Sequence, residues 1–78
     1  MNALFQVSDI ASGAFAGRTV TVKAFGGKDL DLVEACHRDG LLPGFARGSL
    51  DLVDVEYVGD GRVTLSHEGE VLAVAQEI

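Results

Sequence analysis

The chain has 78 residues and a mass of 8.2 kDa, and 47% of its residues are hydrophobic. A chain of this length forms one small domain over residues 1–78, and its core leaves little room for a large internal cofactor. The formal charge of −6 disfavours direct binding to nucleic acid, and the single cysteine excludes an internal disulfide or a multi-cysteine metal site.

Nothing in the sequence resembles a membrane or export segment. No window approaches the roughly 18 apolar residues that a membrane-spanning helix requires. Residues 1–6 have neither a basic region nor a long apolar stretch, so they do not resemble a signal peptide. We therefore expect a cytoplasmic protein that does not contact a membrane.

The first third of the chain predicts two strands. Leu4–Val7 forms a short apolar run, and Thr19–Phe25 is rich in β-branched residues and alternates between apolar and polar positions. The alternation puts three apolar residues of the second strand on one face: Val20, Val22 and Ala24. Residues 8–18 contain turn signals but no clear element.

One short helix is predicted over residues 32–39. Asp31 and Glu34 have the spacing of a capping box, in which each side chain accepts from the other residue's backbone N–H. Gly40 occupies the position of a left-handed cap at the helix end. The core-facing side of this helix consists of apolar residues: Leu32, Val33 and Cys36.

The following loop, residues 41–48, cannot continue the helix because it contains Pro43 and Gly44. The loop is unusually apolar and contains three large hydrophobic residues: Leu41, Leu42 and Phe45. Two interpretations are open. We expect these side chains to close one end of the core, and the alternative is an exposed apolar contact surface.

The last thirty residues predict three antiparallel strands. A three-residue loop, Gly59–Gly61, pairs Tyr57 with Val63 and Val55 with Leu65, so that apolar residues face apolar residues. A two-residue turn at Glu68-Gly69 then pairs Leu65 with Leu72 and Val63 with Val74. The predicted buried face contains seven residues: Val53, Val55, Tyr57, Val63, Leu65, Leu72 and Val74.

These elements predict a small α+β domain of order ββαβββ. Its last three strands form an antiparallel meander, and the one short helix packs on the sheet. The last strand is apolar on both faces, because its second face contains Val71, Ala73 and Ala75. Such a strand is usually covered on both sides. We expect the N-terminal strands to cover this second face, and the alternative is a homodimer, as in a self-associating structural subunit.

The candidate catalytic residues are sparse. Cys36 and His37 are adjacent, but side chains of helical neighbours point in different directions, and Cys36 lies on the apolar stripe. His67 is expected to face Glu70 across a turn, where a solvated pair is the common outcome. No spacing suggests a metal site or a cofactor. We therefore expect a protein that is not an enzyme, and a small enzyme or ligand-binding domain is the alternative that the sequence favours least.

The distribution of acidic residues is the main functional signal. Residues 29–78 contain eleven acids against three arginines, a net charge of −8. Asp54 and Glu56 alternate on one strand face, about 6.6–7 Å apart, which is close to the phosphate spacing of one DNA strand. The candidate binding residues are carboxylates on or beside the last strands: Asp51, Asp54, Glu56, Asp60, Glu68 and Glu70.

This pattern predicts a non-catalytic module that binds a basic protein surface. Within that class, we favour an inhibitor of the kind found in phages and mobile elements, which occupies the nucleic-acid-binding surface of its partner. The simpler alternative is that the acidic face only keeps the protein in solution.

Overall fold

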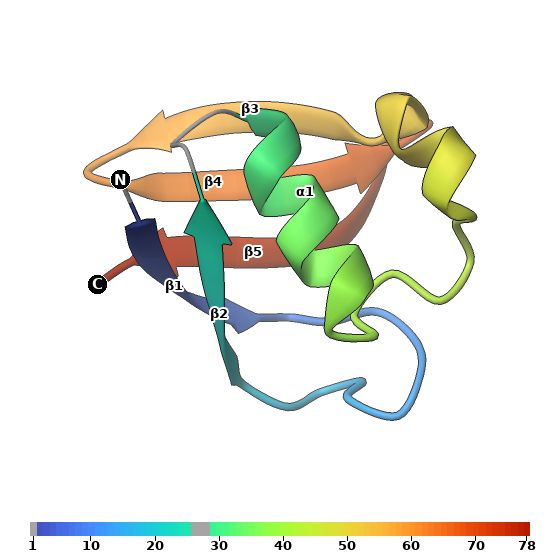
Figure 1. Cartoon of the computed structure of the whole chain (residues 1–78), viewed down its shortest axis with the longest axis horizontal. Coiled ribbons are helices and arrows are strands. Elements are labelled where there is room, and N and C mark those ends of the chain that lie inside the picture. Colours follow the sequence, from blue (N-terminus) through green and yellow to red (C-terminus); the bar gives the residue numbers. More distant parts are fainter. Residues whose placement is uncertain (1, 26–28) are drawn as a thin grey trace.

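The computed structural model describes residues 2–25 and 29–78 (Figure 1). The elements follow in the order β1 (Asn2–Ser8), β2 (Val20–Phe25), α1 (Asp29–Arg38), the 3₁₀ helix η1 (Arg47–Leu52), β3 (Asp54–Gly59), β4 (Arg62–His67) and β5 (Glu70–Glu77). All five strands belong to one antiparallel sheet of order β2-β1-β5-β4-β3. The predicted α+β class and the order ββαβββ are therefore confirmed.

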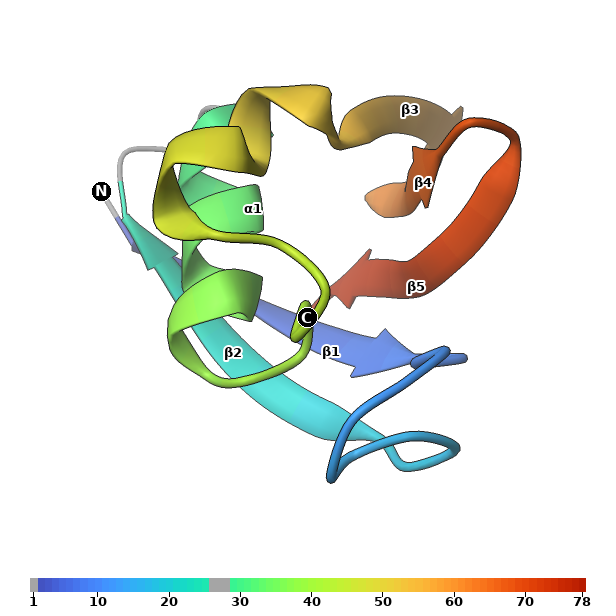
Figure 2. The same cartoon turned by 90° about the vertical axis from the view of Figure 1, so that its right-hand side faces the viewer.

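The sheet wraps around one helix. Figures 1 and 2 show α1 lying across one face of the curved sheet, with η1 on the same side. The prediction that the N-terminal strands cover a face of β5 is wrong. Strand β1 instead lies beside β5 in the same sheet, where Val7 pairs with Ala75. In the described part of the chain, no helix is long and apolar enough to cross a membrane.

The core lies between α1 and the inner face of the sheet. Its largest fully buried side chains come from β1, β2, α1, β4 and the loop after α1: Val7, Val22, Val33, Cys36, Leu41, Val63 and Leu65. The unassigned segment 8–18 contributes Ile10, which is 3% exposed. The N–H of Gly17 donates to the carbonyl of Ile10 at 3.0 Å, which folds this segment into a compact loop.

Helix α1 begins earlier than predicted. It starts at Asp29, so Asp31 lies within the first turn and is not the capping residue of a box with Glu34. A carboxylate in the first turn is favourable because the N-terminal end of the helix dipole is positive. The capping-box pattern was therefore misleading, although the residues predicted to face the core are buried.

The end of α1 follows the prediction. Gly40 has a φ of +82° and its N–H donates to the carbonyl of His37 at 3.1 Å. The N–H of Leu41 donates to the carbonyl of Cys36 at 2.9 Å. These two hydrogen bonds form the Schellman motif, and they turn the chain so that the buried Leu41 packs under the helix end.

The apolar loop after α1 closes the core. Leu41 and Leu42 are buried and Phe45 is half-buried, so the first interpretation of this loop is correct and the two leucines are not an exposed contact surface. Helix η1 follows and was not predicted. Only Leu50 of this short element is buried, so the sequence has no apolar periodicity that would reveal it.

The register of β3 on β4 is as predicted, but the turn differs. Asp60 and Gly61 both have positive φ, of 54° and 77°, which is the type I′ conformation of a two-residue turn. A bulge between Tyr57 and Gly59 absorbs the additional residue. The four pairs of the strand bodies are Asp54–Ser66, Val55–Leu65, Glu56–Thr64 and Tyr57–Val63.

The predicted register of β5 on β4 is wrong by one residue. The turn pairs His67 with Glu70, as expected, but the register then shifts at Leu72. Ser66 pairs with Val71 before this bulge, and beyond it the observed pairs are Leu65–Ala73, Thr64–Val74 and Val63–Ala75. A single inserted residue exchanges the two faces of a strand, so the alanines face the core and Val74 does not.

Two surfaces of the structure differ from the prediction. Ala73 and Ala75 are fully buried, so the proposed homodimer surface with Val71 does not exist as one exposed face. Val71 alone is 50% exposed. Tyr57, predicted to be buried, is 63% exposed because β3 is an edge strand and α1 packs on β2 and η1.

Candidate functional site

Strand β3 presents two carboxylates to solvent. Val55 pairs with the fully buried Leu65, so its neighbours Asp54 and Glu56 point to the opposite face of the sheet, away from α1. Both acids are exposed, as predicted from the alternation. Across the hairpin they meet the small polar residues Ser66 and Thr64, which leave the carboxylates accessible.

The two carboxylates of this face, those of Asp54 and Glu56, form no ion pair in the described part of the chain. Arg62, the basic residue on the neighbouring strand, stands in register with Gly59 and Gln76 and forms no ion pair with either acid. Because both acids are exposed and neither is held in an ion pair with a described residue, they are accessible to a cation of a partner.

The other candidate acids do not form one cluster with this pair. Asp51 lies in η1 just before β3, and Glu68 and Glu70 lie at the turn between β4 and β5. These three are therefore near the Asp54 end of the hairpin, whereas Asp60 lies at its opposite end. We call Asp54 and Glu56 the acidic edge, and only Asp51, Glu68 and Glu70 extend it.

His67 is held by structural contacts. Its Nδ1 atom lies 3.0 Å from the carbonyl oxygen of Leu52, and its ring meets Phe45 edge to face at 5.2 Å. Glu70 faces His67 across the turn, as predicted, and the Nε2 atom of His67 also lies 3.7 Å from a carboxylate oxygen of Glu68. These contacts join the β4 end to η1 and the apolar loop.

Cys36 is unsuited to nucleophilic chemistry at neutral pH. Its side chain is fully buried on the core face of α1, as predicted. Burial, with a smaller contribution from the charge of Asp39, raises the pKa of the thiol to about 12. The thiolate is the reactive form of cysteine, and it is scarcely populated at neutral pH with such a pKa.

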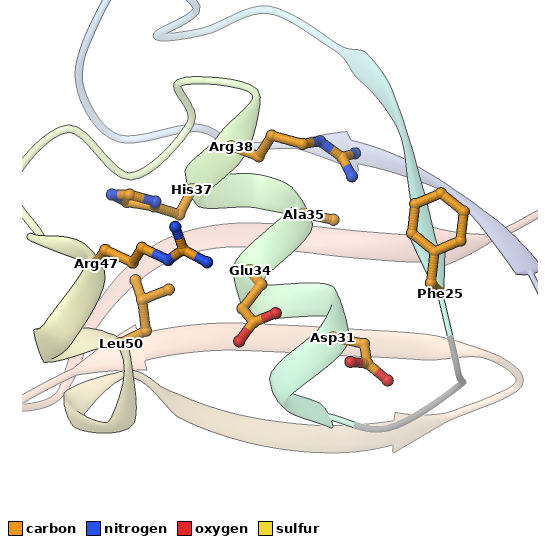
Figure 3. A pocket seen from close by; sticks show the side chains of 8 residues that line it. All are labelled: Phe25, Asp31, Glu34, Ala35, His37, Arg38, Arg47 and Leu50. Atoms are coloured by element: carbon orange, nitrogen blue, oxygen red, sulfur yellow. The ribbon is translucent and has the colours of Figure 1, made fainter.

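A shallow groove of about 360 Å³ runs over the outer side of α1 (Figure 3). Its lining combines residues of α1 with Phe25 at the end of β2 and residues of η1: Asp31, Glu34, Ala35, His37, Arg38, Arg47 and Leu50. Its lining contains both carboxylates and basic side chains, so it does not present a uniform charge to a ligand.

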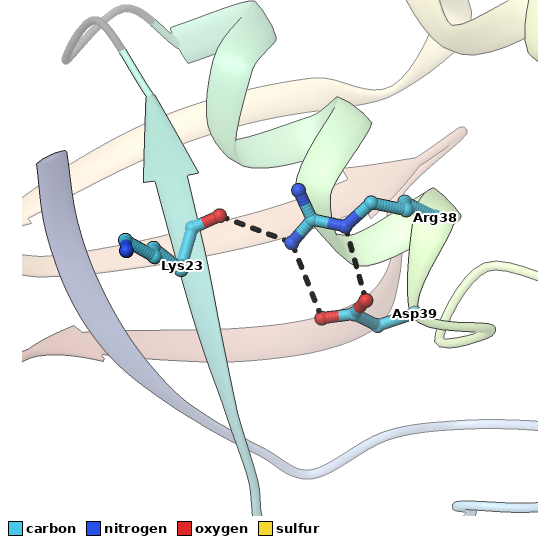
Figure 4. Close-up of polar contacts among 3 residues, drawn as sticks. All are labelled: Lys23, Arg38 and Asp39. Atoms are coloured by element: carbon cyan, nitrogen blue, oxygen red, sulfur yellow. Dashed lines mark hydrogen bonds and ion pairs between the residues drawn. The ribbon is translucent and has the colours of Figure 1, made fainter.

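One residue of this groove closes an edge of the sheet (Figure 4). Arg38 donates from Nη2 to the carbonyl oxygen of Lys23 in β2 at 3.0 Å, and its Nε lies 3.1 Å from the carboxylate of Asp39. The cations of Lys23 and Arg38 also lie 5.7 and 6.0 Å from the ring centre of Phe25. The sequence predicts none of these contacts, because they depend on how α1 lies against β2.

Neither a cluster of metal ligands nor a related protein assigns chemistry to these surfaces. In the described part of the chain, no three His, Cys, Asp or Glu residues come together as a metal site would require. Comparison with protein-family models, with curated proteins and with solved structures finds no match to this chain. The case for a function therefore depends on the residues themselves.

Proposed function

We propose that this protein is a non-catalytic interaction module that binds a basic surface of another protein through its acidic edge. The observation that supports this function most directly is the exposure of Asp54 and Glu56 on an edge strand, where neither acid forms an ion pair with another described residue. Exposed charges of this kind accelerate and orient association with a surface of opposite charge.

The partner surface that we propose is one that also binds nucleic acid. Two carboxylates at alternate positions of a strand are about 6.6–7 Å apart, which is close to the spacing of successive phosphates. A cationic surface that follows a phosphate backbone therefore offers charges at a suitable distance. The protein would act as an inhibitor by occupying that surface, in the manner of phage or mobile-element proteins.

The buried thiol of Cys36 and the structural contacts of His67 agree with a role that requires no catalysis. The alternative of self-assembly through Val71, Ala73 and Ala75 receives no comparable support, because the two alanines are fully buried. An interaction module is therefore the function that the described residues support best.

The test measures binding of a fluorescent decalysine peptide at low and moderate salt. The double variant Asp54→Lys/Glu56→Lys should weaken binding several-fold, mainly by slowing association. The variant Glu34→Lys/Glu77→Lys makes the same change in net charge at exposed positions outside β3 and should weaken binding less. Equal losses in the two variants, or binding that salt does not change, would contradict a specific acidic edge.

A further inference from the structure

The two edges of the sheet are not equivalent. At the β2 edge, Arg38 occupies the carbonyl oxygen of Lys23 and blocks the approach of another strand. At the other edge, β3 is the last strand of the sheet, and among the described strands it pairs only with β4. Natural proteins usually protect such edges, because an unpaired strand offers a row of backbone donors and acceptors to another chain.

The side chains of β3 are sorted by face. Asp54 and Glu56 project outward, whereas Val55 and Tyr57 belong to the face on which α1 lies. Val55 is half-buried, and Tyr57 on the same face is 63% exposed. A strand added beside β3 would therefore meet acids on one face and apolar surface on the other.

A second copy of the chain does not suit this edge. Two β3 strands related by a two-fold axis would place Asp54 and Glu56 of one copy against the same acids of the other. Like charges at opposed positions destabilise strand pairs. Pairing with the β2 edge of another copy would require the hydrogen bond from Arg38 to Lys23 to break. The occupant that fits is a different chain of opposite charge.

We propose that the β3 edge binds an extended segment of the partner as a sixth strand of the sheet. The segment carries Lys or Arg at alternate positions, which face Asp54 and Glu56, and apolar residues between them, which contact Val55 and Tyr57. Backbone hydrogen bonds supply affinity in this mode of recognition, and the alternating side chains supply specificity. The bulge before Gly59 ends the regular part of the edge. This inference rests on the proposed function and specifies how the acidic edge is used.

The first experiment uses a synthetic peptide of about eight alternating lysine and valine residues, a length typical of a strand. Two further versions carry backbone N-methyl groups, one on every lysine and one on every valine, and keep all the charges. Because alternate residues of a strand direct their N–H groups to opposite edges, only one version should lose about tenfold or more in affinity. Equal affinity of all three peptides, or equal loss in both methylated versions, would overturn strand addition.

Amide hydrogen exchange of the protein then locates the added strand. We expect the unmodified peptide to slow exchange along β3 and to leave β2 unchanged. Protection along β2 instead would overturn the assignment of the edge. If the peptides bind equally and the affinity still depends on Asp54 and Glu56, the acidic edge functions without strand addition. If no peptide binds, the proposed function fails as well.

A charge exchange supplies the specificity control. The variant Asp54→Lys/Glu56→Lys should no longer bind the lysine–valine peptide. It should instead bind the corresponding glutamate–valine peptide, since the apolar face and the backbone of β3 are unchanged. Circular dichroism establishes that the variant is folded. A folded variant that binds neither peptide would contradict the paired arrangement of charges.

Discussion

The Nδ1 atom of His67 lies 3.0 Å from the carbonyl oxygen of Leu52, and this contact determines the tautomer of the neutral imidazole. A carbonyl oxygen only accepts hydrogen bonds, so Nδ1 carries the hydrogen and, in the neutral ring, Nε2 has the free lone pair. Nε2 points toward the exposed carboxylate of Glu68 at 3.7 Å. The end of β4 is thereby connected to the end of η1.

Replacement of His67 by Ala should therefore destabilise the protein. The variant loses the hydrogen bond to Leu52 and the edge-to-face contact with Phe45. Each contributes on the order of 1 kcal/mol, so we expect a loss of about 1–2 kcal/mol in the free energy of unfolding, measured with urea. The control Glu68→Gln removes only the exposed 3.7 Å pair and should cost much less. Equal effects of the two variants would contradict this role of His67.

The shifted register of β5 leads to a second prediction. Ala75 is fully buried in the core on a strand flanked by β1 and β4, so Ala75→Leu should overpack the core and cost about 1–3 kcal/mol. Val74 is half-buried on the other face, and Val74→Leu adds one methylene with little cost, within about 0.5 kcal/mol. Urea unfolding of both variants measures the difference. The opposite ranking would support the register without the bulge.

The two hairpins show how far sequence patterns reach. Between β3 and β4, polar residues alternate with Val55 and Tyr57, so only one register pairs apolar with apolar side chains, and it is the observed one. Val71–Ala75 is apolar at every position, and alternation then prefers neither face. In the structure, the face that carries the small side chains of Ala73 and Ala75 is the one that joins the core.

The candidate site was predictable in part for the same reason. Alternation along β3 is enough to expose Asp54 and Glu56. The edge position of β3 could not be predicted, because it depends on the long-range pairing of β1 with β5. The contact of Arg38 with Lys23 depends in turn on the packing of α1 across the sheet. Contacts between elements distant in sequence leave no periodic signal in either element.

The buried thiol of Cys36 predicts a loss of stability at alkaline pH. Its pKa is about 12 in the folded protein, compared with an ordinary value of 9.0 that applies to the unfolded chain. Between these two values the folded state binds more protons than the unfolded state, so the free energy of unfolding falls as pH rises. The contribution is fully present below pH 9 and is lost progressively toward pH 12.

Replacement of Cys36 by Ala removes this contribution, so the difference between the wild type and the variant isolates it from other groups that titrate in this range. We expect the free energy of unfolding of the wild type to fall more steeply above pH 9 than that of Cys36→Ala. At lower pH the variant should be modestly less stable, because a buried atom is removed. A thiol reagent at mildly alkaline pH should modify native Cys36 slowly and the urea-unfolded chain rapidly, since only the unfolded chain exposes an ionisable thiol. Parallel pH profiles together with rapid native modification would mean that Cys36 is accessible to solvent, in contradiction to its place in the core.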